Sequence, residues 1–322
     1  MIIAFLDTVH PILWERLTDE GHGCEDATQY SLGDILEGKL KHVHGVVVRA
    51  RILLTPAVLD ALPHLRFIAR SGSGLENIDL QAAQQRGIQV FNSPEGNSNA
   101  VGEHALGLLL GLLRHIPRAD RSIRSGQWLR EAHRGTELSS LTVGIIGLGH
   151  TGGAFARKLQ SIGCTVLAYD KYRAHYDGEW GVKAVPLEDL FQKADVISLH
   201  LPLNAETRGW VQDDWFKQWV KGGWFLHTAR GPIASTDAIF RALQSGHLKG
   251  AALDVLDMEE ATLEGLQHHW HNHPIFEDPR VIFTPHIAGW TYESYFALSN
   301  VLADKILKAF PRDAKLGRSQ IL

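Results

Sequence analysis

A strand, turn and helix pattern between Leu141 and Asp170 constrains the fold of this chain more than any other feature. An apolar run, Leu141–Ile146, leads into the turn Gly147-Leu148-Gly149-His150-Thr151-Gly152, and the apolar spacing that follows is helical. Glycines in such a turn let the backbone approach a pyrophosphate, and the next helix directs N–H groups and partial positive charge toward it. The pattern therefore predicts a dinucleotide-binding unit with Gly147, Gly149 and Gly152 in the turn.

The segment after the helix predicts which dinucleotide binds. A second strand-like run, Thr165–Tyr169, ends in Asp170, eighteen residues after Gly152. A carboxylate at that strand end would accept hydrogen bonds from the adenosine ribose hydroxyls and would repel a 2′-phosphate. We therefore expect NAD as the cofactor rather than NADP, although the cations Lys171 and Arg173 follow. The alternative is a glycine turn that binds nothing.

Length and composition narrow the class of protein. At 322 residues the chain is long enough for two domains, and a net charge of −4 from 32 basic and 36 acidic residues predicts no nucleic-acid face. No apolar run is long enough to span a membrane, and the amino terminus does not resemble a signal peptide. Two distant cysteines, Cys24 and Cys164, fit a reducing compartment. We expect a cytoplasmic protein that acts on a small molecule.

Strand-like and helical runs alternate along the whole chain, which predicts an α/β fold with two Rossmann-like or flavodoxin-like domains and doubly wound parallel sheets. The final apolar helix, Glu293–Phe310, is expected to return to the first domain. We predict a discontinuous substrate domain, residues 1–95 plus 291–322, and a NAD-binding Rossmann domain, residues 96–290. The expected strands are 2–6, 46–49, 67–70, 89–91, 141–146, 165–169, 195–199, 223–228, 250–255 and 281–284.

One helix is expected to join the two domains. Asn92–Gly96 has the composition of a loop, and Ala100–Ile116 carries apolar residues at helical spacing. This helix should cross into the second domain, and it is apolar enough to pack against a second copy of the chain.

Three strand ends after the glycine turn carry residues able to do chemistry. Arg230 follows an apolar strand, several acids follow Ala251–Leu253, and His286 follows Phe283-Thr284-Pro285. Because open α/β sheets bind ligands at the carboxyl ends of their strands, these side chains should converge. An arginine there offers a bidentate fork for a carboxylate, and a histidine can exchange protons near neutrality. A surface ion pair for Arg230 and an ordinary polar role for His286 are the alternatives.

Six ordered motifs give the chain a family resemblance. Beside the glycine turn with Asp170, they are Ser71–Asp79, Gly102-Glu103-His104, Asp195–Leu203, Thr228-Ala229-Arg230-Gly231, Leu253-Asp254-Val255 and Thr284–Gly289. Together they resemble the D-isomer-specific 2-hydroxyacid dehydrogenase family, within it the D-3-phosphoglycerate dehydrogenase-like branch.

The resemblance implies roles for individual residues. Arg230 would grip the substrate, Glu259 would orient His286, and His286 would move the proton. The resemblance also suggests a homodimer. It implies cofactor contacts from His150, Thr151, Asp170, Thr228 with Ala229 and Arg230, Asp254, and the turn from His286 to Gly289.

The chain departs from the family pattern at four places. Glu260 follows Glu259 where the family usually has proline, which makes Glu260 a rival for the acid. His227 stands where asparagine is common, and Trp290 replaces a small residue. The histidine-rich stretch His268–His273 has no fixed ligand spacing, and we expect no metal there.

The predicted substrate groups lie in the first domain. The loop Gly72-Ser73-Gly74 can direct backbone N–H groups at a carboxylate. Arg49, in the pair Arg49 and Arg51 after a strand, can hold a phosphate or second carboxylate, with surface ion pairing as the alternative.

These observations lead to one functional hypothesis and one alternative. We hypothesise NAD-dependent hydride transfer between C2 of a D-2-hydroxy acid and nicotinamide, with a 3-phosphoglycerate-like acid as one candidate substrate. The alternative is a non-catalytic, NAD-sensing interaction protein of the corepressor kind.

Overall fold

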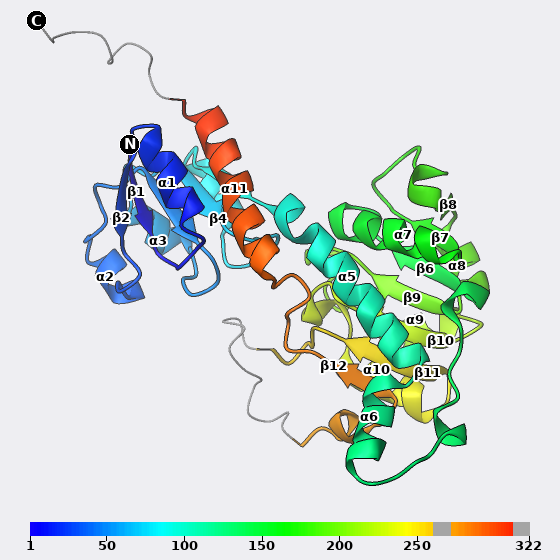
Figure 1. Cartoon of the computed structure of the whole chain (residues 1–322). Helices are drawn as coiled ribbons and strands as arrows, with labels where there is room; N and C mark the ends of the chain where they lie inside the picture. The colour runs from blue at the N-terminus through cyan, green and yellow to red at the C-terminus, as the bar shows by residue number, and fades with distance from the viewer. Residues whose placement is uncertain (260–271, 312–322) are drawn as a thin grey trace, which may run out of the picture. The chain divides into compact units, whose positions relative to one another are not determined.

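Two parallel β-sheets organise the computed structural model of the chain, which describes residues 1–259 and 272–311. One sheet belongs to a unit made of Met1–Asn97 and the segment that begins at Thr291; the other belongs to a unit spanning Ser98–Trp290. Helices cover both faces of each sheet (Figure 1). The predicted α/β class with doubly wound parallel sheets is confirmed.

The first unit contains a five-stranded parallel sheet in the order β2-β1-β3-β4-β5. This is a flavodoxin-like order, which reverses direction between β1 and β3 and so opens a ligand-binding crevice at their carboxyl ends. The strands are β1 (Ile2–Phe5), β2 (Gly23–Asp26), β3 (Gly45–Val48), β4 (Phe67–Arg70) and β5 (Gln89–Asn92), and the helices are α1 (Ile12–Asp19), α2 (Leu32–Leu36), α3 (Pro56–Asp60), α4 (Leu80–Gln85) and α11 (Tyr292–Ala309).

Side-chain alternation along these strands builds two cores. Successive strand residues point to opposite faces of a sheet. Ile3 and Phe5 of β1 pack with α1 and with Leu302 of α11, whereas Ala4 and Leu6 pack on the other face with α2, α3 and α4. Helix α11 therefore covers one face of the sheet that contains β1, although the two elements are far apart in the sequence.

The second unit contains a seven-stranded parallel sheet in the order β12-β11-β10-β9-β6-β7-β8. The order reverses between β6 and β9, as it does in dinucleotide-binding Rossmann folds. Its strands are β6 (Thr142–Ile146), β7 (Thr165–Tyr169), β8 (Lys183–Ala184), β9 (Val196–Leu199), β10 (Gly223–His227), β11 (Leu248–Leu253) and β12 (Val281–Phe283). Its helices are α6 (Ile116–Arg124), α7 (His150–Ile162), α8 (Leu187–Lys193), α9 (Asp213–Gln218) and α10 (Thr236–Gln244), and it shares α5 (Pro94–Leu113), which crosses the unit boundary.

Both faces of this sheet are also buried. Val143 and Ile145 of β6 pack against α5 and α7, and Ile146 packs on the opposite face with α8, α9 and α10. The apolar residues of α5, among them Leu109 and Leu112, are buried in this core. These side chains are covered within the chain, and the expected packing of this helix against a second copy stays a prediction for its other residues.

Several predicted bounds are corrected. Residues Pro94–Gly96, part of the predicted loop Asn92–Gly96, belong to the first turn of α5, since Pro94 takes the first helical position, where its missing N–H costs nothing. The helix ends at Leu113, and α6 begins at Ile116 after His115 in a left-handed conformation (φ 55°). The edge strands β2 and β8 are additional to the predicted strands.

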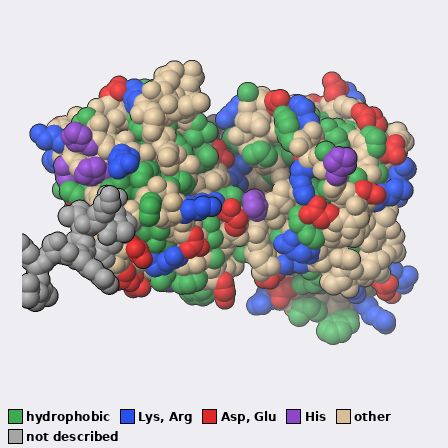
Figure 2. Space-filling view, turned by 90° about the horizontal axis from the view of Figure 1, so that it is seen from above, with side chains coloured by type: hydrophobic (Ala, Val, Ile, Leu, Met, Phe, Trp, Pro, Cys, Tyr) green, Lys and Arg blue, Asp and Glu red, His purple; other side chains and the backbone are tan. Residues whose placement is uncertain are grey.

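The described surface carries both charge signs. On the face shown in Figure 2, Lys and Arg side chains are interspersed with Asp and Glu side chains. Among the helices of residues 1–259 and 272–311, none is long and apolar enough to cross a membrane. Cys24 and Cys164 are free thiols.

Candidate active site

The glycine turn lies at the switch point of the larger sheet. Gly147 follows β6 with φ 91°, and a Cβ there would lie 2.4 Å from the carbonyl oxygen of His200, which follows β9. A Cβ at Gly152 would lie 2.0 Å from the carbonyl oxygen of Gly147. Both positions therefore require glycine for backbone packing alone.

Gly149 differs from these two glycines because nothing lies within 4 Å of the place its Cβ would take. It is the residue before α7, and no side chain caps that helix. The first N–H groups of α7, from His150, Thr151 and Gly152, have no partner within the helix by its geometry. Open space at Gly149 and uncapped N–H groups fit a pyrophosphate.

Asp170 ends β7 beside this turn. Its carboxylate accepts hydrogen bonds from the N–H groups of Leu148 (2.7 Å), Tyr172 (2.9 Å) and Arg173 (3.0 Å). A carboxylate has about four lone-pair directions, so one acceptor position is left for a ribose hydroxyl. Asp170 therefore also holds the glycine turn in place, a structural role that its position in the sequence does not reveal.

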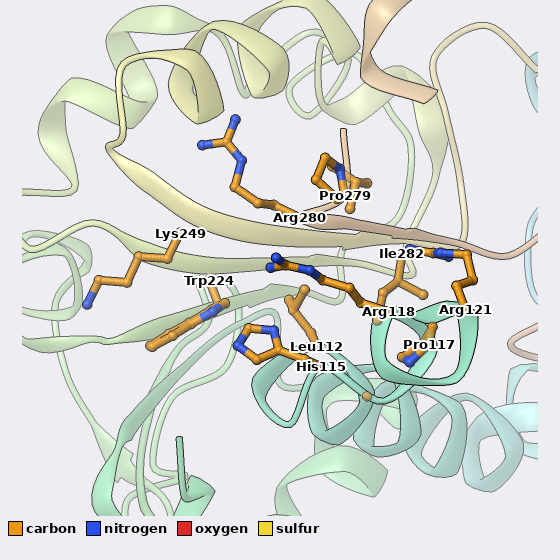
Figure 3. Close-up of a pocket in the computed structure, with 12 residues that line it drawn as sticks. Leu112, His115, Pro117, Arg118, Arg121, Trp224, Lys249, Pro279, Arg280 and Ile282 are labelled. Carbon is orange, nitrogen blue, oxygen red and sulfur yellow. The ribbon is translucent and has the colours of Figure 1, made fainter. Parts of the chain in front are cut away.

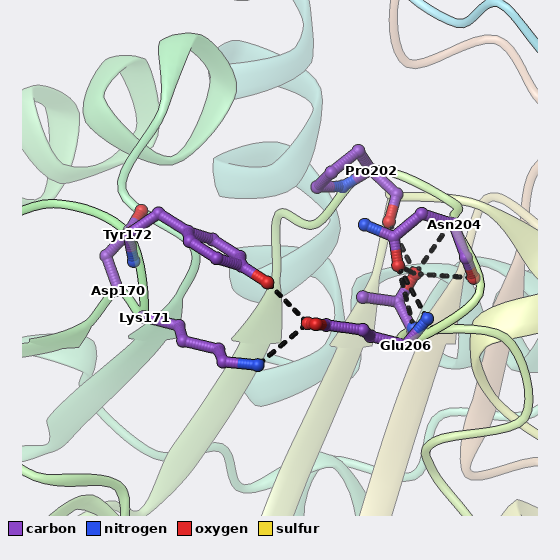
Figure 4. A network of polar contacts seen from close by, with 7 residues as sticks. Asp170, Lys171, Tyr172, Pro202, Asn204 and Glu206 are labelled. Atoms are coloured by element: carbon purple, nitrogen blue, oxygen red, sulfur yellow. Dashed lines mark hydrogen bonds and ion pairs between the residues drawn. The ribbon is translucent and has the colours of Figure 1, made fainter. Parts of the chain in front are cut away.

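A second acid, Glu206, lies beyond Asp170. Figure 4 shows Lys171 and Tyr172 converging on the Glu206 carboxylate, with Lys171 Nζ 2.8 Å from Oε2. The bond to Lys171 lowers the pKa of Glu206, and Glu206 raises the pKa of Lys171. Asn204 orders this loop by accepting N–H bonds from Glu206 (2.9 Å) and Thr207 (3.0 Å). The cation next to Asp170 is thus already neutralised, which no sequence signal indicated.

Buried polar groups follow the central strands. Thr228, directly after β10, has a buried hydroxyl without a hydrogen-bond partner among the described residues. Burial lowers the pKa of His227 to about 4, and backbone groups of Gly231 and Arg230 offset this only in part. Burial also lowers the pKa of His200 to about 3. Both imidazoles are therefore neutral at physiological pH, and the free Thr228 hydroxyl suits a bound cofactor.

Glu259 and His286 are in contact. Nδ1 of His286 lies 2.8 Å from Oε2 of Glu259, and the two side chains are 24% and 16% exposed. The other Glu259 oxygen accepts the N–H of Leu256. An ionised Glu259 favours the proton on Nδ1, which leaves Nε2 of His286 as the acceptor. Glu260, the rival acid, lies outside the described residues.

A buried aspartate holds the turn that carries His286. His286 has φ 55°, an unfavourable conformation for a residue with a side chain. The Asp254 carboxylate accepts N–H bonds from Ile287 and Ala288, each 2.9 Å, and the hydroxyl of Thr284 at 2.6 Å. Burial alone would raise the pKa of Asp254, but its hydrogen bonds outweigh burial and lower it. This places Asp254 beneath the turn, whereas its predicted cofactor contact stays a prediction.

His104 supports the same cluster from α5. Its Nε2 lies 3.0 Å from the Thr284 hydroxyl and 3.5 Å from the Asp254 carboxylate. His104 lies in the Gly102-Glu103-His104 motif, from which no role for it was predicted. The motif itself was the signal that could have identified it.

Arg230 lies at the end of a neighbouring strand. The last residues of β10, β11 and β12, which are His227, Leu253 and Phe283, pair in register. Arg230 follows this edge by three residues, is half-buried, and donates a hydrogen bond to the carbonyl of Ala229 at 2.8 Å. Two strand spacings, roughly 10 Å, separate the ends of β10 and β12, the strands that Arg230 and His286 follow.

The predicted substrate residues of the first unit lie at the carboxyl edge of its own sheet. Asp7 and Arg49 flank the switch point between β1 and β3, and the N–H of Arg49 donates to the Asp7 carboxylate. Burial lowers the pKa of the half-buried Arg49, and Asp7 counteracts this. Arg51 is instead engaged in holding the fold, since it bonds the carbonyls of Leu6 and Tyr30 and pairs with Asp7.

The loop Gly72-Ser73-Gly74 follows the neighbouring strand β4. The Ser73 hydroxyl lies 2.7 Å from Asn97 Oδ1, the Ser73 carbonyl accepts a 2.7 Å bond from Asn92, and the Gly72 carbonyl accepts the N–H of Ser93 at 2.9 Å. The Gly72 and Ser73 carbonyls and the Ser73 hydroxyl therefore all have hydrogen-bond partners. This rigid loop and Arg49 end adjacent strands of one sheet.

Most of the histidine-rich stretch, where we expect no metal, lies outside the described residues. Of that stretch His273 is described, and its Nε2 lies 3.0 Å from Asp237. Within residues 1–259 and 272–311, no group of three or more His, Cys, Asp or Glu side chains could hold a metal ion.

The geometry defines a dinucleotide-binding α/β protein with a histidine–carboxylate pair at the carboxyl edge of its sheet. Residues 106–288, more than half of the chain, match the family model described as "D-isomer specific 2-hydroxyacid dehydrogenase, NAD binding domain". The chain belongs to the D-isomer specific 2-hydroxyacid dehydrogenase family, as its motifs predicted, and the larger sheet forms the NAD-binding domain of that family.

The names of similar proteins are consistent with this family. D-3-phosphoglycerate dehydrogenase of Archaeoglobus fulgidus is 36% identical over 263 residues, which cover 81% of this chain and 48% of that protein. The Homo sapiens protein of the same name is 35% identical over 293 residues, covering 91% and 53%. The chain thus spans about half the length of these relatives. A crystal structure of D-lactate dehydrogenase from Aquifex aeolicus, complexed with NAD and lactic acid, has a TM-score of 0.81 and 28% identity, covering 96% of this chain and 95% of that chain.

Proposed function

We propose that this chain catalyses NAD-dependent oxidation of a D-2-hydroxy acid and the reverse reduction of the 2-keto acid. The observation that carries the proposal is the 2.8 Å contact between His286 and Glu259, at the carboxyl edge of the sheet whose switch point holds the glycine turn. Family membership and the relatives named D-3-phosphoglycerate dehydrogenase support a 3-phosphoglycerate-like acid as the first substrate to test.

The residues present fit NAD. The open face of Gly149 and the first N–H groups of α7 would hold the pyrophosphate, Asp170 would bind the adenosine ribose, and the free hydroxyl of Thr228 would hold the nicotinamide end. When bound, NAD supplies the acceptor for the hydride that leaves C2.

His286 is the base in this proposal. Nε2 takes the proton of the substrate hydroxyl during oxidation and returns it to the keto oxygen during reduction. Glu259 keeps the Nδ1 proton in place and stabilises the imidazolium that forms, so that Nε2 alone exchanges protons. Positioned proton transfer of this kind contributes roughly 10²- to 10⁴-fold to the rate.

Arg230 binds the acid. Its guanidinium presents paired N–H donors to the substrate carboxylate and polarises the keto oxygen during reduction. The register of β10 and β12 supports this arrangement, because the substrate must reach both Arg230 and His286. In the first unit, Arg49 and the backbone of Gly72-Ser73-Gly74 are proposed to bind a carboxylate or phosphate.

We also propose that the chain forms a homodimer through the carboxyl end of α6 and the segment that follows it. Ile123, Trp128 and Leu129 are 52%, 83% and 46% exposed there. Light scattering of the Trp128→Ser and Ile123→Ser double variant tests this, with Leu36→Ser, exposed on α2, as the control. A monomer for the double variant alone supports the proposal, and an unchanged mass for all three proteins contradicts it.

A substrate panel tests the activity. Purified protein with NADH is expected to reduce at least one of phosphohydroxypyruvate, hydroxypyruvate and glyoxylate, measured by loss of absorbance at the NADH band. NADH binding is measured separately by calorimetry on the same protein. Binding of NADH without turnover on a broad panel of 2-keto acids would contradict the enzymatic proposal and favour the non-catalytic, NAD-sensing alternative.

A further inference from the structure

The second unit carries a pocket at the end of the sheet opposite to Arg230 and His286. It lies at the amino ends of β10, β11 and β12, beneath the end of α5 and the start of α6. Figure 3 shows the residues from the strands on one side of the pocket and those from the helices on the other. The empty space over its lining residues is about 380 Å³, a value that includes open solvent. Its lining includes Leu112, Arg118, Arg121, Trp224, Lys249 and Arg280.

The charge in this pocket has one sign. Four of the described lining residues are Arg or Lys, and none is acidic. The Arg280 guanidinium pairs with the carboxylate of Asp278, which is not a lining residue, through two contacts of 2.9 and 2.6 Å. The guanidinium groups of Arg118 and Arg121, in contrast, have no hydrogen bond or ion pair with any described residue, whereas Arg124 of the same helix pairs with Asp120 at 2.7 Å.

The helix adds to this positive charge. Arg118 lies in the first turn of α6, where there is no acidic residue and no side-chain cap. A helix carries partial positive charge at its amino end, so a cation there is unfavourable unless an anion is nearby. An anion in the pocket would interact favourably with the helix end and with both guanidinium groups.

The strand side provides an aromatic surface. The Lys249 ammonium lies 4.8 Å from the centre of the Trp224 ring, which holds it beside the pocket. Leu112 and Ile282 complete an apolar wall. The combination of a cationic side with an apolar side suits an organic anion.

We propose that this pocket is a second ligand site, which binds a small organic anion through a phosphate or paired carboxylates. Arg118 and Arg121 bind the oxyanion, because their planar forks match phosphate and carboxylate oxygens, and Lys249 adds charge. Trp224 contacts the apolar part of the ligand. The site is separate from the glycine turn and does not depend on the proposed redox function.

Calorimetry with inorganic pyrophosphate tests the site. The titration is done at low ionic strength with saturating NAD, so that the glycine turn is not the site measured. We expect saturable binding that the Arg118→Gln and Arg121→Gln double variant weakens roughly ten- to a hundredfold, the worth of one or two charged hydrogen bonds. Arg124→Gln, on the same helix but paired outside the pocket, is the matched control and should bind like the unmodified protein.

A second measurement uses the unmodified protein and so tests the site even if the double variant fails to fold. In ¹⁵N-labelled unmodified protein, the Trp224 indole signal, assigned with Trp224→Phe, should shift on addition of pyrophosphate. Citrate in place of pyrophosphate distinguishes a carboxylate site from a phosphate site. Absence of binding by either probe at millimolar concentration, or equal binding by the double variant and the control, overturns the proposal. Failure of the substrate panel leaves these results unaffected.

Discussion

The main-chain N–H of His286 donates a 2.8 Å hydrogen bond to the main-chain carbonyl of Asp254, while the Asp254 carboxylate binds the N–H groups of the next two residues. A left-handed conformation such as that of His286 costs about 1–3 kcal/mol unless the surroundings hold it. Asp254 supplies those bonds from a buried position, 2% exposed. It therefore acts on the candidate base through the backbone.

Asp254→Asn should destabilise the chain by about 1–3 kcal/mol, because an amide cannot accept all the bonds that the carboxylate accepts. The pKa of Asp254 is lowered in the folded state, so its stabilisation is present above the ordinary value of 3.8 and is lost as the pH falls through the folded value. Urea denaturation from pH 7 to pH 3 measures both effects. An unchanged unfolding free energy at pH 7 would mean that Asp254 does not anchor the turn.

Glu259→Gln should keep the contact with His286 but remove its charge. The loss of one charge-assisted hydrogen bond to the forming imidazolium predicts a roughly ten- to a hundredfold lower kcat, with NADH affinity unchanged. Glu277→Gln, an exposed acid, is the control. Steady-state kinetics across pH distinguish stabilisation of the imidazolium from a purely structural role of Glu259. A purely structural Glu259 would leave the pH profile of kcat unshifted.

Asp170→Ala should weaken NADH binding and improve NADPH binding, because it removes the charge that repels a 2′-phosphate. Glu206→Gln should improve NADPH binding as well, because it releases Lys171 from its 2.8 Å ion pair. Asp189→Ala, paired with Lys193 on α8, is the control. Fluorescence titration with both cofactors gives the affinity ratios, and equal affinity of the unmodified protein for the two would contradict the role of Asp170.

His227 should make the fold sensitive to mild acid. Its pKa falls from 6.5 to about 4 on folding, so the unfolded state binds more protons between these values and stability decreases as the pH falls from 6.5 toward 4. The loss amounts to roughly 3 kcal/mol. His227→Asn should flatten this part of the profile in urea denaturation, whereas His175→Asn, exposed and left-handed like His286, should not. Identical slopes for both variants would show that His227 does not titrate as described.

Much of the fold could be predicted from the sequence because buried parallel strands are continuous apolar runs. The two strands that were not predicted, β2 and β8, both lie at sheet edges. The β2 sequence, Gly23–Asp26, contains no β-branched or aromatic residue, and β8 has two residues. An edge strand needs no apolar side chains on both faces, so periodicity does not reveal it.

The site was predictable where chemistry dictates residue type and not where packing decides the partner. The family resemblance implied Glu259 as the partner of His286, and the 2.8 Å contact joins these two residues. Nothing in the sequence distinguishes Arg49 from Arg51, yet only Arg51 is engaged with the carbonyls of Leu6 and Tyr30. The ion pair between Lys171 and Glu206 joins residues 35 positions apart, because the tertiary fold brings them together.

The most direct test of the enzymatic proposal is the turnover of His286→Ala with the best keto acid of the panel, measured beside its affinity for NADH. If Nε2 of His286 moves the proton, kcat/KM should fall roughly 10²- to 10⁴-fold while NADH binds as tightly as before. Turnover close to that of the unmodified protein would contradict the proposed mechanism.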